Sequence, residues 1–443
     1  MDLMVGKLNR LPIETQKALQ QLACMGNSAE FALLAMVYQD SKEDMHDDLW
    51  EAVRTGLVFR SEGAYRFLHD RVQEAAYSLI PADLRAAAHV RIGRLLAAHT
   101  PPEKREEAIF EIVNQLNRGS ALITSQPERE QLAELNLMAG KRAKASTAYA
   151  SALTTLAAGA ALLAEDSWER RHELTFALEL QRAECEFLTG ALAEAEQRLT
   201  ALSARAATTV ERASVTCLRA DLYTTLDQGS RAIAVGLDYL RHLGIDWSAH
   251  PTDEETRREY ERIWSQLGSR MIEDLIELPL MSDPASLATM DVLTKIGPPS
   301  LHTDAHLFSL VICRAVNLSL ETGNCDGSCF AYVRLGMVAG SRFGDYHAAY
   351  RFGRLGHDLV ERHGLKRFQG RTYMCFGGFV LPWTRHVRVG RDLLHRGLQA
   401  ANKMGDLVYA ACGHHLTTNL LATGDPLVDV QREAENGLAF AQK

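Results

Sequence analysis

The chain has 443 residues, of which 47% are hydrophobic and 23% are charged. This length and balance predict a folded, water-soluble protein of about two to three units. The formal net charge of −8 excludes nucleic-acid binding through bulk positive charge, because neutralising phosphates needs a surplus of Lys and Arg. The hydrophobic residues are mainly Ala and Leu, and aromatic residues make up only 7%, which favours helix.

Cysteine usage and hydropathy predict a reducing, cytoplasmic setting. The eight cysteines are scattered, and the one close pair, Cys325 and Cys329, has no second pair or His cluster to complete a metal site. No apolar stretch reaches the roughly 18 residues that a membrane-spanning helix needs, and the N-terminus lacks the features of a signal peptide. Both ends of the chain fall within helical patterns, so we expect a longer parent protein.

Three helices and a hairpin are predicted over residues 8–81. The segments "LPIETQKALQQLACMG" (11–26), "SAEFALLAMVY" (28–38) and "SKEDMHDDLWEAVRTG" (41–56) have helical patterns, the last with a capping box formed by Ser41 and Asp44. Two short apolar runs, Leu57–Arg60 and Tyr65–Leu68, flank the turn "SEG" and predict a β-hairpin. This element order is that of a winged helix.

The third predicted helix of this winged helix is acidic. It carries two basic and five acidic residues, namely Lys42 and Arg54 against Glu43, Asp44, Asp47, Asp48 and Glu51. An acidic helix is repelled by the phosphates that border the major groove. We therefore expect this module to contact protein and predict no nucleic-acid partner.

Helical periodicity continues from His69 to Gly119 and then changes to a repeat. Ala183, Gly190 and Ala195 recur 37 residues later as Ala220, Asp227 and Ala232. Turns with the same signature follow at Gly344 with Ala349 and at Gly424 with Asp425. Small residues where two helices touch, with a turn between the helices, are typical of tetratricopeptide-like repeats. The segment 279–302, which includes "LPLMSDP" and "GPPS", is expected to interrupt the repeats.

The sequence contains no recognisable self-contained active site. The phosphate-binding loop, the protein-kinase motifs and the Gly-x-Ser-x-Gly nucleophile elbow are all absent. His172 begins a segment like a zinc-protease helix but has no second His four residues later. His414 and His415 are adjacent and point in different directions on a helix, so we expect surface or interhelical roles for them.

The pair His69-Asp70 in "YRFLHDRVQEAAYSLIP" (65–81) admits several interpretations. A phosphate-accepting histidine kinase motif requires Thr-Pro shortly after the acid, whereas the next proline here is Pro81. A protein-kinase catalytic loop requires His-Arg-Asp, and the order here is different. A purely structural interpretation is that His69 and Asp70 cap a helix in which Arg71 and Glu74 pair.

Long strings of the chain resemble one class of large bacterial signalling proteins. The strings are "LPIETQKALQQLACMGN", "YRFLHDRVQEAAYSLIP", "EIVNQLNRG", "LAELNLMAGKRAKASTAYASAL", "RAECEFLTG", "IELPLMSDP", "FGDYHAAYRFG" and "GDPLVDVQREAENGLAFAQK". In that class a serine/threonine-kinase-like domain precedes an AAA-related nucleotide-switch ATPase of the STAND type. A winged helix and tetratricopeptide-like repeats follow, and often a sensor histidine kinase.

The resemblance implies an all-α fold with one small β-hairpin, in which a winged helix precedes a tetratricopeptide-like α-solenoid. Residues 1–81 would be the winged-helix end of the ATPase module, 82–145 a helical connector, and 146–443 degenerate repeats. Leu68-His69-Asp70 would stand where related proteins sense the β-phosphate of ADP, with His69 and Asp70 forming the sensor. ATP or ADP with Mg²⁺ would be held by the parent's ATPase domain, and this chain would hold no cofactor or metal itself.

The resemblance further implies a regulatory role. A protein partner or signal ligand on the repeats would bias a nucleotide switch in the upstream ATPase domain, and catalysis, if any, would belong to the kinase domains of the parent. Two alternatives remain at this point: a fragment of an ATPase–repeat transcription activator, and a free-standing protein-interaction scaffold. A histidine kinase centred on His69 is a third, which would carry phosphate on that residue.

Overall fold

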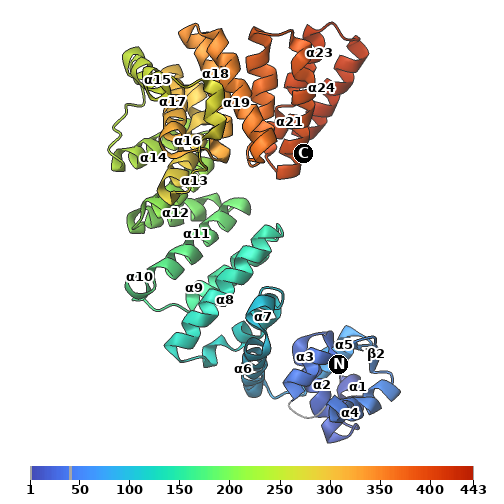
Figure 1. Cartoon of the computed structure of the whole chain (residues 1–443). Coiled ribbons are helices and arrows are strands. Elements are labelled where there is room, and N and C mark those ends of the chain that lie inside the picture. Colours follow the sequence, from blue (N-terminus) through green and yellow to red (C-terminus); the bar gives the residue numbers. More distant parts are fainter. Residues whose placement is uncertain (1, 39–41, 443) are drawn as a thin grey trace. The chain divides into compact units, whose positions relative to one another are not determined.

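The computed structural model describes residues 2–38 and 42–442, and most of these residues are in helices (Figure 1). Two compact units make up the chain, Met1–Arg198 and Leu199–Lys443. The predicted fold class, a mostly helical chain with one small antiparallel sheet near its N-terminus, is confirmed. The finer division at residues 81 and 145 stays a prediction.

The first unit opens with a winged helix. Its elements are α1 (Asp2–Leu8), α2 (Ile13–Met25), β1 (Ser28–Glu30), α3 (Phe31–Tyr38), α4 (Lys42–Arg54), β2 (Val58–Ser61) and β3 (Ala64–Phe67). The three strands form an antiparallel sheet in the order β1-β3-β2. The predicted hairpin is confirmed as β2 and β3, whereas the predicted capping residue Ser41 lies outside the described residues.

One part of this prediction is wrong. Residues 28–30 were expected to begin a helix, but they form β1, which pairs Ser28 with Arg66 and Glu30 with Ala64. The apolar run that follows them is helical and forms α3. Pairing across 36 residues of chain decides the conformation of β1, and local periodicity carries no signal for such long-range pairing.

The rest of the first unit is a succession of helices. They are α5 (Asp70–Ser78), α6 (Ala82–His99), α7 (Ile109–Arg118), α8 (Gln126–Ala145), α9 (Tyr149–Ala161), α10 (Ser167–Arg170) and α11 (His172–Leu188), with short 3₁₀ segments at Pro102–Lys104 and Ser120–Leu122. The boundary between the two units falls within the next helix, α12 (Leu192–Arg205). Apolar side chains from α6, α7, α8, α9 and α11 share one core. Pairs of neighbouring helices such as α8 and α9 pack against each other, as tetratricopeptide-like repeats do.

The second unit is a larger bundle of helix pairs. Its helices are α13 (Thr209–Thr225), α14 (Gly229–His242), α15 (Asp253–Leu267), α16 (Pro284–Thr303), α17 (Ala305–Thr322), α18 (Asp326–Phe343), α19 (Tyr346–His363), α20 (Gln369–Cys375), α21 (Arg391–Met404), α22 (Leu407–Ala411), α23 (His414–Ala422) and α24 (Leu427–Ala441). Short turns of helix lie at η3 (Ile272–Glu277), η4 (Phe376–Val380), η5 (Leu381–Trp383) and η6 (Val387–Gly390). One extensive apolar core joins α13 through α21.

The same turn closes several helix pairs in both units. Thr147, Gly190, Asp227, Gly405 and Gly424 all have positive φ, between 56° and 83°. In each case the next residue donates its N–H to the carbonyl five residues earlier, at 2.7–3.1 Å. This is the Schellman arrangement, which ends a helix and satisfies its last carbonyls. The turns predicted at Gly190, Asp227 and Gly424 are therefore confirmed.

The interruption predicted at 279–302 is wrong for its second half. Helix α16 runs through Gly297-Pro298-Pro299-Ser300 without a break. Each proline removes one helical N–H donor, at a cost of about 3 kcal/mol in a helix interior. The carbonyls of Thr294 and Lys295 lose their helical donors in this way. Packing of α16 against α13, α14 and α17 offsets this loss.

Candidate functional site

The predicted sensor residues lie at the start of α5, directly after the hairpin. His69 is the residue before the helix, with extended backbone (φ −146°, ψ 148°), and its side chain makes no capping hydrogen bond. His69 and Asp70 are both exposed. The capping interpretation is therefore wrong for the His69 side chain, and within residues 42–442 no ion pair joins Arg71 to Glu74.

The backbone at this position suits an anion. The His69 carbonyl accepts hydrogen bonds from the N–H groups of Val72 (2.9 Å) and Gln73 (3.4 Å), so the helix begins there. The amides of Asp70 and Arg71 lie in the first turn, where N–H groups have no acceptor within the helix. Such an end carries partial positive charge and favours a phosphate. The carboxylate of Asp70 opposes this, and in the described structure it does not hydrogen-bond to His69.

A buried chain of hydrogen bonds starts from the other end of α5. Tyr77 Oη lies 2.9 Å from His89 Nε2, and His89 Nδ1 lies 2.6 Å from Gln115 Oε1. The Gln115 amide then donates to the Cys24 carbonyl at 2.9 Å. Because Gln115 Oε1 can only accept, His89 carries its proton on Nδ1 and accepts the Tyr77 hydroxyl on Nε2. The chain thus joins α5, α6 and α7 to the end of α2.

Acidification is expected to destabilise this part of the molecule. Burial lowers the pKa of His89 below its ordinary value of 6.5. The folded state therefore binds the second imidazole proton, which makes the ring positively charged, less tightly than the unfolded state does. The contribution of neutral His89 to the free energy of unfolding is fully present above pH 6.5. It falls as the pH drops toward the lowered pKa, by at most about 1.4 kcal/mol per pH unit. Urea unfolding of wild type and His89→Gln from pH 7.5 to 5 measures this difference. Parallel pH profiles for the two proteins would contradict it.

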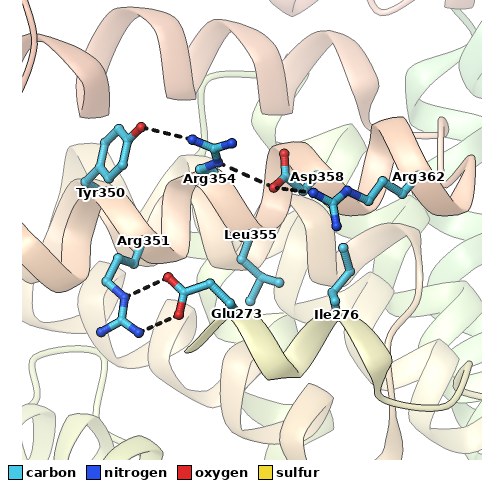
Figure 2. A pocket seen from close by; sticks show the side chains of 8 residues that line it. All are labelled: Glu273, Ile276, Tyr350, Arg351, Arg354, Leu355, Asp358 and Arg362. Atoms are coloured by element: carbon cyan, nitrogen blue, oxygen red, sulfur yellow. Dashed lines mark hydrogen bonds and ion pairs between the residues drawn. The ribbon is translucent and has the colours of Figure 1, made fainter. Parts of the chain in front are cut away.

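An arginine-lined groove is a candidate site in the second unit (Figure 2). It has a volume of about 340 Å³ and lies between η3 and α19. Ile276, Leu355 and Tyr350 form its floor. Its walls are charged and consist of Arg351, Arg354, Arg362, Glu273 and Asp358. We call this feature the α19 groove.

One wall of the α19 groove is a complete ion pair. Arg351 Nε donates to Glu273 Oε1 at 2.8 Å, and a second bond joins Arg351 Nη2 to Glu273 Oε2 (Figure 2). This bidentate contact lowers the pKa of the Glu273 carboxyl to about 2. The pair is electrically balanced and fixes η3 against α19. It therefore leaves the unbalanced charge of the groove to the opposite wall.

On that wall two arginines share one carboxylate. Asp358 Oδ2 lies 3.5 Å from Arg354 Nε and 3.8 Å from Arg362 Nη2 (Figure 2). These distances exceed those of strong charge-assisted hydrogen bonds, which are about 2.7–2.9 Å. The arginine side chains are 59% and 65% exposed, so most of their donors face solvent. Arginines at positions 351, 354 and 362 against two acids leave an excess of one positive charge in the groove.

The other residues considered from sequence do not form a site. Cys325 and Cys329 are buried, and burial raises the pKa of both thiols, which makes them unreactive. Burial lowers the pKa of His415 to about 4, and its ring packs edge-on against Phe379. His172 stacks on Phe176 within α11. Among residues 2–38 and 42–442, no group of His, Cys, Asp or Glu is arranged to hold a metal ion.

Sequence reasoning missed both the His89 chain and the α19 groove. A single sequence does signal His89 weakly, as one of two polar residues, with Arg91, in the otherwise apolar run "AAAHVRIG". The groove has a clearer signal, because Arg351, Arg354, Asp358 and Arg362 recur at helical spacing. Their partner Glu273 lies 78 residues away from Arg351 in the chain, and nothing local predicts that contact.

The fold is that of a helical region with a winged helix at its N-terminal end, and sequence comparison finds a distant relative. The chain is 22% identical, over an alignment 501 positions long with its gaps, to hybrid signal transduction histidine kinase G of Dictyostelium discoideum. The alignment covers 95% of this chain and 14% of that protein, so the chain spans a small part of its relative. The predicted resemblance to histidine-kinase signalling proteins is thereby confirmed as a distant similarity.

Two further comparisons bear on this similarity. No family model matches the chain. A structural match was found with the crystal structure of a STAND protein with a tetratricopeptide repeat sensor from Pyrococcus horikoshii. The match covers 98% of this chain and 63% of the Pyrococcus chain, with a TM-score of 0.39 and 12% sequence identity. That likeness is too weak to place any residue. In the described part of the chain, no helix combines the length and apolar character needed to cross a bilayer.

Proposed function

We propose that this chain is the regulatory part of a signal-transduction protein that couples partner binding on the helical repeats to a nucleotide switch. The nucleotide, ATP or ADP with Mg²⁺, would be held by an ATPase domain of the parent protein. The His69 imidazole would contact its phosphate, and Asp70 would lie beside His69 as the second residue of the sensor. The observation that carries the proposal is the placement of this exposed pair at the open end of α5, whose other end is fixed by the His89 chain.

The geometry supports the individual steps. A phosphate at the start of α5 would accept hydrogen bonds from the free amides and from the His69 imidazole. Tyr77 lies on the same helix and contacts His89, so a change in the position of α5 disturbs a buried network in which every partner is satisfied. Buried polar networks resist partial disruption. They therefore favour two discrete arrangements, which a switch requires.

The α19 groove is the surface to which we assign the signal. Its excess positive charge and apolar floor match an acidic segment that also carries apolar side chains. A partner bound there would bias the switch only if its affinity differs between the two states of the parent. The signal is thus read on the repeats and the nucleotide on the winged helix.

The proposal is tested by joining this chain to the ATPase domain of its parent and replacing His69 with Ala. We expect ADP affinity to fall by about tenfold, because a hydrogen bond to a charged group contributes about 1.5–3 kcal/mol. Isothermal titration with ADP measures the change. The matched control is His99→Ala, which removes another exposed histidine of the same unit. Equal ADP affinity in the two variants would refute the sensor role of His69.

A further inference from the structure

Arg334 is a buried arginine without a carboxylate partner. It lies on α18, is 6% exposed, and among the described residues no ion pair or hydrogen bond reaches its guanidinium. Two rings flank it instead, with Phe308 and Phe330 centroids at 4.7 and 5.0 Å. Cation–π contacts of this kind contribute about 2 kcal/mol each when desolvated. They offset only part of the cost of burying a charge.

The surrounding helix makes room for this charge. A Cβ atom on Gly297 of α16 would lie 2.1 Å from Arg334 Nη1 and 2.4 Å from Nη2. The missing side chain at Gly297 therefore leaves space that the guanidinium occupies. The neighbouring Arg371 differs, because it is paired with Asp406 through its Nε. Both arginines lie near the Phe330 ring. Among the described residues, the charge of Arg371 is paired with a carboxylate and that of Arg334 is not.

A small cavity lies beside the Arg334 guanidinium. Apolar side chains of α16, α17 and α18 line most of it, and its polar lining comes from Arg334 and Thr294. Thr294 is 5% exposed, and its hydroxyl has no hydrogen-bond partner among the described residues. The cavity volume of about 10 Å³ corresponds to about one water-sized guest. A peptide segment does not fit inside a space of this size.

We propose that this cavity holds a single monatomic anion, chloride under cellular conditions, bound by the Arg334 guanidinium and the Thr294 hydroxyl. A buried cation requires a compensating charge, the cavity admits one small guest, and both polar groups on its wall can donate to it. The anion would fill the space where α16, α17 and α18 meet and balance the charge of Arg334. A water molecule is the rival guest, since Pro298 has no N–H to donate to the Thr294 carbonyl and that carbonyl would accept from water.

Chloride-dependent stability separates the two guests. The 443-residue chain is unfolded thermally in chloride and in gluconate at equal ionic strength, because gluconate is too large for the cavity. We expect the melting temperature to be about 2–4 °C higher when chloride is at about five times its dissociation constant. Thr294→Val is expected to weaken this chloride response. Equal melting temperatures in the two salts would overturn the proposal.

Arg334→Met provides the decisive variant. Replacing an uncompensated buried charge with an apolar side chain of similar length is often neutral or stabilising. We therefore expect the variant to melt no lower than wild type in gluconate and to lose the chloride response entirely. Arg371→Lys, which keeps its charge beside Asp406, should retain the response, and its loss there would count against an Arg334 site.

Crystals grown in bromide give a second measurement that does not depend on stability. An anomalous peak beside Arg334 and Thr294 would identify the anion directly. Density without anomalous signal would identify an ordered water and refute the proposal. If Arg334→Met failed to fold, this measurement on wild type would still decide between the two.

Discussion

Replacing Gly356 with Leu is expected to destabilise the Leu199–Lys443 unit by about 3 kcal/mol. Gly356 lies on α19 where this helix packs against α18. A Cβ at this position would lie 2.4 Å from the Cys329 carbonyl oxygen and 2.7 Å from a methyl group of Val333. The carbonyl belongs to the backbone of α18 and cannot rotate away, so the two helices must separate. Urea unfolding followed by circular dichroism measures the loss.

The opposite effect is expected at a helical glycine in open space. A Cβ on Gly437 of α24 would meet nothing within 4 Å. Gly437→Ala should therefore stabilise the protein by about 0.5–1 kcal/mol, the usual gain when alanine replaces glycine inside a helix. Comparison of the two variants separates close helix packing from helix propensity. If Gly356→Leu unfolded at the same urea concentration as wild type, the packing of α18 on α19 would be wrong.

Reversing two charges in the α19 groove is expected to weaken binding of an acidic partner strongly. In Arg354→Glu combined with Arg362→Glu, three negative side chains including Asp358 would line one wall. The probe is a fluorescent ten-residue peptide rich in Glu with two Leu residues, followed by fluorescence anisotropy at low salt. We expect its affinity to fall by about tenfold or more, since like charges at an interface cost several kcal/mol. Wild-type affinity should also fall as salt is added.

A pair of arginines on α15 supplies a matched control. Arg257 and Arg258 are 57% and 66% exposed and lie 3.5 and 3.7 Å from Asp253 and Glu254. These values nearly equal those of Arg354 and Arg362, and neither residue lines the groove. Reversing both to Glu changes the net charge equally and should leave peptide binding intact. Equal loss in the two double variants would show that binding depends on overall charge rather than on the groove.

The fold could be predicted from sequence wherever local signals decide it. The hairpin followed from turn chemistry at "SEG", and the repeat turns followed from Gly190 and Gly424. The failures have long-range causes. Strand β1 depends on pairing with β3. Helix α16 keeps its helical path through Pro298 and Pro299 because of packing on three neighbouring helices, although the local signal for a break was strong.

The candidate sites divide in the same way. His69 and Asp70 could be singled out because they are adjacent in sequence and follow a predictable hairpin. The His89 chain joins residues from four separate helices, and the α19 groove joins η3 to α19 across 78 residues. Arg334 reads in sequence like any other arginine of a helix. Only the packed structure reveals that no carboxylate among residues 2–38 and 42–442 pairs with its charge.

The recurring turn at Thr147, Gly190, Asp227, Gly405 and Gly424 has a consequence for how such a chain changes over generations. Each turn needs one residue that tolerates positive φ and leaves the remaining positions of its helix pair free to vary. Substitution can therefore change most residues around such a turn, provided that the one position with positive φ keeps a residue that tolerates it.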